Sequence, residues 1–296
     1  MLMILCHHRL VTTSQLKRLA QPDVTYPHYL RKTLSGLRQA GLVDRVFRPA
    51  GGDCAWFTTE AGARLAEGEG AVPPRAYRMD AERAQGALQA HTLTVVETGL
   101  AFLEHARRSG YSMGPLSWTP EVAHRYRDGK RFEATHLISD AVLDYVLVKG
   151  STSWHVHCFL EVDRATMPPL RLAQKVGAYL RHYSYIPGED RRRTRTATRP
   201  RSYAWQNRYT WSPRLLVILA GGTEQRLKRR MDELYLRTEG LRRALDSDLP
   251  FGAGVTLLPW LKERGPRAKI FKLLHIDHDG LTDHRAGRCP MRPAAS

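Results

Sequence analysis

Apolar residues recur at helical spacing in the first part of the chain and in short alternating or continuous runs further on. Residues 1–66 predict two helices, a two-stranded hairpin and the start of a third helix. Residues 67–83 lose this periodicity and gain glycine and proline, so we predict a linker there. From residue 84 on, strands and helices alternate, which is typical of an α/β domain.

The first 66 residues have the order helix, helix, hairpin that is typical of a winged helix-turn-helix. Thr12 and Gln15 have the spacing of a capping box at the start of one helix. A second helix is expected over residues 25–40, with leucines on one side and basic residues on the other. In such a module the second helix enters the major groove of DNA and the hairpin contacts the backbone. The residues expected to contact DNA are Arg31, Lys32, Ser35, Arg38, Arg45 and Arg48.

Residues 84–276 are expected to form a second domain with a central mixed sheet, so the whole chain is predicted to be α/β, with an α+β character overall. Strands are expected at residues 136–148, 154–163, 213–220, 254–258 and 269–274. Helices are expected at residues 84–109, 170–183 and 224–244. Residues 277–296 show no periodicity and are expected to form a disordered tail.

The net charge of the chain is the strongest indication of what kind of partner it binds. Its 46 lysines and arginines against 29 aspartates and glutamates leave a net charge of +17. Such an excess favours a polyanionic partner, most often nucleic acid. Residues 189–201 concentrate this charge without apolar periodicity and are expected to form a mobile basic loop. The arginines of this loop that we expect to contact DNA are Arg191, Arg192, Arg193 and Arg195.

The remaining composition excludes several classes of protein. Four scattered cysteines, with no CxxC spacing, argue against a disulfide framework and suit a reducing cytoplasm. The apolar opening is too short for a signal peptide core, and no run is long enough to span a membrane. We therefore expect a cytoplasmic protein without a membrane partner.

The candidate chemistry lies on two neighbouring strands of the second domain. Asp140 lies within one apolar run, residues 137–143, and Glu161 and Asp163 share one face of the next strand, since side chains alternate along a strand. Unpaired acids are costly to bury, so their place beside apolar residues points to a function. Asp140 and Glu161 are suitable ligands for Mg²⁺ or Mn²⁺ at a phosphodiester, with Lys175 of the following helix as the candidate basic residue. Strand-end capping, a pairing of Asp163 with Arg164, or a solvated position of Lys175 would explain the same residues without chemistry.

Several of these residues also form motifs in a set order. In the first part of the chain, the motifs are Leu37-Arg38-Gln39-Ala40-Gly41-Leu42-Val43 and Phe57-Thr58-Thr59-Glu60-Ala61-Gly62. In the second part, they are His91, Trp118 with Glu121, Asp140, Phe159-Leu160-Glu161-Val162-Asp163-Arg164-Ala165-Thr166, Lys175 and Tyr179. In this order and spacing, the chain resembles the replication-relaxation family, from the first helices to about residue 260.

The resemblance implies a winged helix followed by a domain of the restriction-endonuclease-like PD-(D/E)xK fold. It implies that Asp140 and Glu161 form the acidic part of the site. Asp163 stands where the lysine of that motif is expected, so Lys175 is the relocated candidate. The implied function is that of a DNA-binding protein of a plasmid or mobile element, of the replication or mobilisation type, whose nuclease-like domain could nick or cleave DNA with Mg²⁺ or Mn²⁺.

Two other functions stay open at this point. The chain could be a non-catalytic DNA-binding factor with an accessory or regulatory role that uses the fold as a scaffold. It could also be an adaptor, because several winged-helix domains bind protein instead of DNA. A relaxase or a replication protein would then be its partner.

Overall fold

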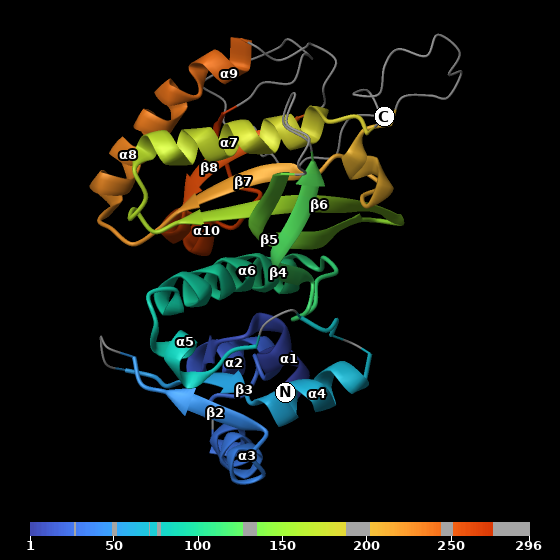
Figure 1. The fold of residues 1–296 in the computed structure, drawn as a ribbon, viewed down its shortest axis with the longest axis vertical. Coiled ribbons are helices and arrows are strands. Elements are labelled where there is room, and N and C mark those ends of the chain that lie inside the picture. The colour runs from blue at the N-terminus through green and yellow to red at the C-terminus, as the bar shows by residue number, and fades with distance from the viewer. Residues whose placement is uncertain are drawn as a thin grey trace. The chain divides into compact units, whose positions relative to one another are not determined.

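The structure, a computed structural model, describes residues 1–26, 28–48, 52–70, 72–75, 78–126, 135–187, 202–243 and 251–274. The chain divides into two compact units, both drawn in Figure 1. The first comprises Met1–Glu104 and Met113–Pro120, and the second comprises His105–Ser112 and Glu121–Ser296. The domain boundaries expected from the sequence stay a prediction.

The first unit combines helices with a small antiparallel sheet. Its elements are α1 (Leu2–His8), β1 (Val11–Thr12), α2 (Thr13–Ala20), α3 (His28–Gln39), β2 (Val43–Val46), β3 (Ala55–Thr58), α4 (Glu60–Gly68), α5 (Ala81–Gln85) and most of α6 (Gln89–Ser109). Within the described residues, the strands lie in the order β1-β3-β2, and both pairs are antiparallel. The predicted hairpin is therefore present as β2 and β3, whereas the winged-helix assignment stays a prediction.

Local signals explain where the helices of this unit begin and end. Thr12 and Gln15 form both hydrogen bonds of a capping box at the start of α2, as predicted. Thr59 caps α4 by accepting a hydrogen bond from the backbone N–H of Gly62. Gly41 follows α3 with a φ of 70°, a conformation that suits glycine at a helix end.

Two sequence predictions for this unit need correction, and one helix was missed. Helix α1 was not predicted, because its residues are apolar nearly throughout and no side chain caps its start. Helix α3 begins at His28 and not at residue 25, since the residue before Pro27 is disfavoured in the helical conformation. The long helix expected over residues 84–109 is interrupted at Gly86, whose extended backbone separates α5 from α6.

The second unit is built on a larger sheet crossed by helices. Its elements are most of β4 (Trp118–Tyr126), β5 (Thr135–Lys149), β6 (Thr152–Asp163), α7 (Pro169–Ser184), the 3₁₀ helix η1 (Ala204–Asn207), β7 (Arg214–Leu219), α8 (Glu224–Arg237), α9 (Glu239–Arg243), β8 (Ala253–Leu257), α10 (Leu258–Arg264) and β9 (Lys272–Leu273). Six described strands lie in the order β4-β5-β6-β7-β8-β9. The predicted mixed α/β fold with a central mixed sheet is confirmed.

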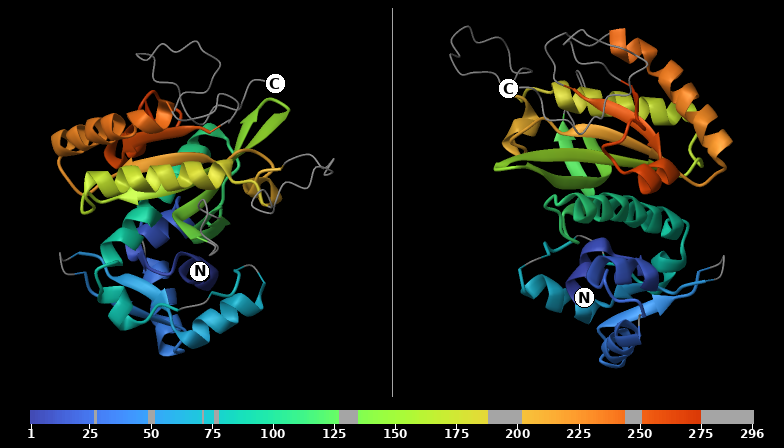
Figure 2. Two further views of the ribbon diagram at one scale, coloured as in Figure 1. Left: turned by 45° about the horizontal axis from the view of Figure 1, so that its top comes forward. Right: turned by 180° about the vertical axis from the view of Figure 1, so that it is seen from behind.

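The sheet contains a parallel centre with antiparallel neighbours. Strands β6, β7 and β8 are parallel, whereas β5 pairs antiparallel with β6 and β9 with β8. Parallel strands need crossover connections, and here these contain α7 and α8. Figure 2 shows both helices side by side along one face of the sheet. The side chains that α7 and α8 direct inward therefore pack against this face of the sheet.

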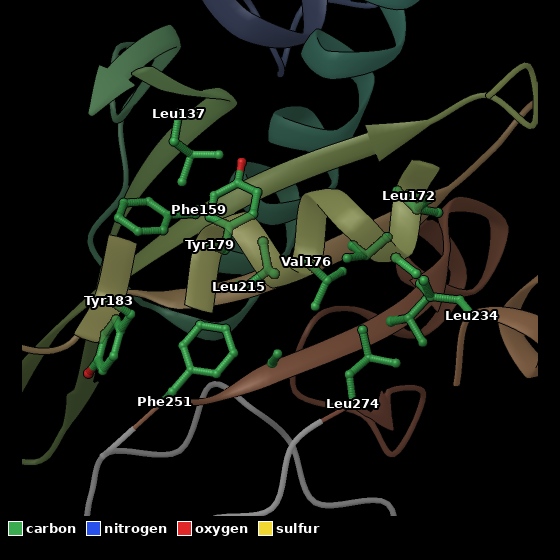
Figure 3. Close-up of a cluster of buried hydrophobic side chains, with 14 of the residues drawn as sticks. Leu137, Phe159, Leu172, Val176, Tyr179, Tyr183, Leu215, Leu234, Phe251 and Leu274 are labelled. Carbon is green, nitrogen blue, oxygen red and sulfur yellow. The ribbon is translucent and has the colours of Figure 1, made fainter. Parts of the chain in front are cut away.

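The core of this unit lies between that face and the two helices. Figure 3 shows Phe159 of β6 and Leu215 of β7 packed against Val176 and Tyr179 of α7. Helix α8 adds Leu234, and all five side chains are buried. Since alternate residues of a strand face the same side, Glu161 and Asp163 lie on the face of Phe159.

Two further predictions are wrong in their bounds. The strand expected over residues 269–274 is confined to Lys272–Leu273. At Ile270 the backbone N–H donates to the carbonyl of Ala268, and the carbonyl accepts from the side-chain hydroxyl of Thr256 in β8. The helix expected over residues 224–244 ends at Arg237, and α9 follows after Thr238.

The basic loop expected over residues 189–201 and the tail expected over residues 277–296 lie outside the described residues. Among those that are described, no helix is both long and apolar enough to cross a membrane.

Candidate functional site

The candidate site lies where strands β5 and β6 meet helix α7. Asp140 belongs to β5 and Glu161 to β6, and the antiparallel register places Ala141 opposite Leu160. The backbone N–H of Val162 donates a 2.7 Å hydrogen bond to Oδ2 of Asp140. This bond attaches the first acid to the strand that carries the second.

Helix α7 supplies two donors to the second acid. The side chain of Glu161 is only 3% exposed, and its Oε1 forms an ion pair with Nζ of Lys175. The hydroxyl of Tyr179 donates a 3.0 Å hydrogen bond to Oε2 of the same carboxylate. Residues four apart lie on one side of a helix, which is why Lys175 and Tyr179 reach one carboxylate together. Nζ of Lys175 also lies 3.8 Å from Oδ1 of Asp140, so the lysine joins the two acids.

Burial controls the electrostatics of this cluster. Burial raises the pKa of Glu161 to about 8, and the charge of Asp140 adds to this rise, while Lys175 and Tyr179 oppose it. Burial by itself would lower the pKa of Lys175. The attraction of its ammonium group to Glu161 and Asp140 outweighs this effect, so the pKa of Lys175 is raised above its ordinary value. The pKa of Tyr179 is raised well above its ordinary value by burial and by both acids, so its hydroxyl remains a donor. One ammonium group, whose side chain is 27% exposed, therefore compensates two largely buried acids.

The chemistry of these donors fits a hard divalent cation. Mg²⁺ in proteins is bound through one or two carboxylates and completes its shell with water and substrate phosphate oxygens. Across the part of the chain that the structure describes, no group of three or more His, Cys, Asp or Glu side chains could hold a metal ion. A cation beside Asp140 and Glu161 would therefore depend on solvent or substrate oxygens for its remaining ligands.

Asp163 makes a different contact. Its side chain, 2% exposed, forms an ion pair with Arg230 of α8. The same guanidinium donates a hydrogen bond to the carbonyl of Met167, in the segment between β6 and α7. Of the four predicted catalytic residues, the structure thus brings Asp140, Glu161 and Lys175 together and pairs Asp163 with a residue from another helix.

The predicted DNA-binding residues of the first unit lie on α3 and on the hairpin. Arg31, Lys32 and Ser35 of α3 are exposed, whereas Arg38 pairs with Asp44 at 2.9 Å. Arg45 is also exposed, and its guanidinium lies over the rings of Phe47 and Trp56, 5.5 Å from each centroid. Arg48 is exposed at the end of the described part of the hairpin. The remaining predicted contacts, Arg191, Arg192, Arg193 and Arg195, lie outside the described residues.

Sequence reasoning missed the part that two residues play. Tyr179 was not counted among the site residues, although its spacing of four from Lys175 indicates a shared helix face. Arg230 carries no such signal, because it lies among several other basic residues of α8.

The comparisons with known proteins identify a family. The sequence model of the replication-relaxation family matches residues 2–198, about two thirds of the chain, including β5, β6 and α7 with their three clustered residues. Neither a curated protein nor a solved structure matches the chain. On the strength of that match, the chain belongs to the replication-relaxation family.

Proposed function

We propose that this protein binds DNA through its first unit and nicks or cleaves it through the Asp140, Glu161 and Lys175 cluster, with Mg²⁺ or Mn²⁺. Membership of the replication-relaxation family suggests a role in the replication or mobilisation of plasmids or mobile elements. The observation that carries the proposal is the position of Lys175, whose Nζ contacts Glu161 and lies 3.8 Å from Asp140. A relocated lysine thus stands beside both acids, although the usual place of that lysine is taken by Asp163.

Each residue has a part that follows from its contacts. Asp140 and Glu161 would hold the divalent cation, which supplies Lewis acidity at the scissile phosphate. Lys175 carries a positive charge within reach of both acids and would offset the charge that develops on a phosphate held there. Tyr179 fixes the orientation of Glu161 through its 3.0 Å hydrogen bond and is a positioning residue.

The competing function is that of a DNA-binding factor that cleaves nothing. It is favoured by the direct ion pair between Lys175 and Glu161, which could equally stabilise an inert scaffold. It is also favoured by the ion pair between Asp163 and Arg230, because an acid engaged in this pair is not available to the cluster of Asp140, Glu161 and Lys175. An adaptor that docks a relaxase or a replication protein has no specific contact of the described residues in its favour.

The test is conversion of supercoiled plasmid to open-circular or linear DNA in the presence of Mn²⁺. We expect the wild-type protein to nick the plasmid. The Asp140→Ala and Glu161→Ala variants should lose at least about 100-fold in rate, the usual loss when one electrostatic group of an active site is removed. DNA affinity in EDTA should stay nearly unchanged, because neither acid belongs to the first unit.

Asp144→Asn is the matched control, since Asp144 lies in the same strand, four residues on, and its side chain is 53% exposed. This variant should nick as the wild type does. If the plasmid stays supercoiled with Mn²⁺, or if the Asp140→Ala/Glu161→Ala double variant nicks as fast as wild type, the nuclease proposal is wrong and the non-catalytic function stands.

A further inference from the structure

Two large aromatic rings that the fold leaves in solvent lie at the start of helix α3, one on its second residue and one two residues before the helix. Tyr26 is 79% exposed and Tyr29 is 73% exposed. Of the twelve residues of α3, only Leu30 and Leu34 are buried, so the helix attaches to the rest of its unit along a narrow edge. The rings of Tyr29 and His28 lie 5.9 Å apart, edge to face. We call Tyr26, His28 and Tyr29 the α3 tip.

Exposed rings in such a group indicate an interaction surface. A single exposed apolar side chain is ordinary, but neighbouring ones that remain uncovered are typical of binding sites. Tyrosine suits such a site, because its ring gives a large contact area while its hydroxyl stays compatible with water. A third ring of the same unit, Phe47, is 71% exposed and lies under the guanidinium of Arg45.

The positive charge around the α3 tip indicates which kind of partner would bind there. Between residues 21 and 48 the chain carries five basic residues, Arg31, Lys32, Arg38, Arg45 and Arg48, against the two acids Asp23 and Asp44. Helix α3 itself contains no acid, and Asp44 is neutralised by its pair with Arg38. Exposed aromatic rings with adjacent positive charge complement a polyanion that also offers flat rings, namely a nucleic acid.

The rings also distinguish between forms of DNA. In a fully paired duplex, the faces of the bases are stacked on one another and only their edges are open in the grooves. An unpaired base exposes its face and can stack on a tyrosine, which increases the affinity for each base that stacks. Tyrosines in place of polar side chains at the end of a basic helix therefore favour DNA in which bases are unpaired.

We infer that the α3 tip binds unpaired bases of DNA by stacking on Tyr26 and Tyr29, while Arg31 and Lys32 contact the neighbouring phosphates. This inference rests on the proposed DNA-binding function and narrows its substrate to DNA with single-stranded or melted stretches. The first unit would then favour opened DNA over paired DNA of the same length and charge.

The experiment compares two labelled DNAs by fluorescence anisotropy, with the full chain in EDTA so that nothing is cleaved. One DNA is a fully paired duplex and the other is the same duplex with a central run of unpaired thymines. The wild type should bind the second DNA at least about tenfold more tightly, the equivalent of one stacked base. The Tyr26→Ala/Tyr29→Ala variant should lose this preference and keep nearly all its affinity for the paired duplex.

Two control variants separate stacking from damage to the fold. Tyr26→Phe/Tyr29→Phe retains both rings and should keep the preference. Leu65→Ala, which removes a half-exposed side chain from α4 of the same unit, should leave both affinities unchanged. Circular dichroism of each variant verifies that it is folded.

Equal affinity of the wild type for the two DNAs would overturn the inference, as would an equal loss on both DNAs in the alanine variant. Binding to neither DNA would overturn it too, and would favour a protein as the partner of the α3 tip. Plasmid nicking with Mn²⁺ is measured separately, so failure of the stacking inference is distinguishable from failure of the nuclease proposal.

Discussion

Two acids on one face of β6 have different partners although only one residue separates them. Glu161 contacts Lys175 and Tyr179 of α7, whereas Asp163 contacts Arg230 of α8. A buried carboxylate needs compensation wherever it lies, because removing its charge from water is costly. The side chain of Lys175 beside Glu161 is still 27% exposed, whereas the buried pair of Asp163 and Arg230 is closed by a further hydrogen bond from Arg230 to the Met167 carbonyl. Asp163 is accordingly compensated by Arg230 and lies outside the cluster of Asp140, Glu161 and Lys175.

This difference gives a prediction for the Asp163–Arg230 pair. Replacing Arg230 by methionine leaves a buried, unpaired carboxylate and should lower the free energy of unfolding by about 3–5 kcal/mol. The Asp163→Leu/Arg230→Met double variant removes both charges and should recover most of that stability. Urea denaturation followed by tryptophan fluorescence measures both effects.

The activity of the same double variant tests the part played by Asp163. Once folded, it should nick plasmid with Mn²⁺ at a rate close to that of the wild type, unlike Asp140→Ala. A variant that is as stable as the wild type but no longer nicks would show that Asp163 belongs to the site after all.

Among the elements, α7 contributes side chains both to the hydrophobic core and to the candidate site. Leu172, Val176 and Tyr183 pack into the core beneath the helix, while Lys175 and Tyr179 reach Glu161. Their spacing follows the helical repeat, so one rigid element sets the positions of the lysine and the tyrosine relative to the sheet. Pro169 in its first turn, with a preset φ, favours the start of this helix at the place observed.

In helix α4, close packing explains why one position of a short sequence motif is glycine. Gly62, part of the Phe57–Gly62 motif, lies against the backbone of Leu42 at the start of the hairpin. A Cβ atom at this position would overlap the Leu42 carbonyl oxygen, which is backbone and cannot move away as a flexible side chain would. The close approach of α4 to this strand therefore requires glycine.

We expect Gly62→Ala to destabilise the first unit, because either α4 or Leu42 must shift, with an effect in the range of about 1–3 kcal/mol for an overpacked site. Gly68→Ala, in the same helix, meets no atom within 4 Å and should be neutral or slightly stabilising, since alanine favours a helix more than glycine. Thermal unfolding of the two variants measures the difference. Equal melting temperatures would refute the packing role of Gly62.

At the scale of the whole molecule, the dominant property is the net charge of +17. Positive side chains that neutralise phosphates release counterions, so DNA affinity should fall steeply with salt. We expect the positive charge of α3 to contribute to this salt dependence, since Arg31 and Lys32 are both exposed.

The predicted measurement is the slope of log affinity against log salt concentration for the paired duplex. The Arg31→Ala/Lys32→Ala variant should reduce this slope by about one for each phosphate that the protein no longer neutralises. Arg64→Ala is the control, because Arg64 is exposed on α4 of the same unit and forms an ion pair with Glu60. A slope that does not change in the α3 variant would remove these residues from the DNA interface.

Much of the fold could be predicted because its signals are local. Capping by Thr12, the turn at Gly41 and the runs that become β5 and β6 are properties of a few consecutive residues. The predictions that were wrong, such as the continuous helix across Gly86 and the longer strand around Ile270, depended on backbone conformation and on a hydrogen bond from a distant residue. The family was likewise within reach of the sequence, through motifs whose order the family match later supported.

The sequence by itself determined that Asp140 and Glu161 belong to two consecutive strands and that a lysine follows on a helix, because strand alternation and helix periodicity act over a few residues. Only the tertiary structure decided which helix covers which acid. The crossover connections of the parallel strands place α7 over Glu161 and bring Arg230 of α8 to Asp163, 67 residues away in the chain. Such pairings depend on packing between elements distant in sequence, which no local pattern specifies.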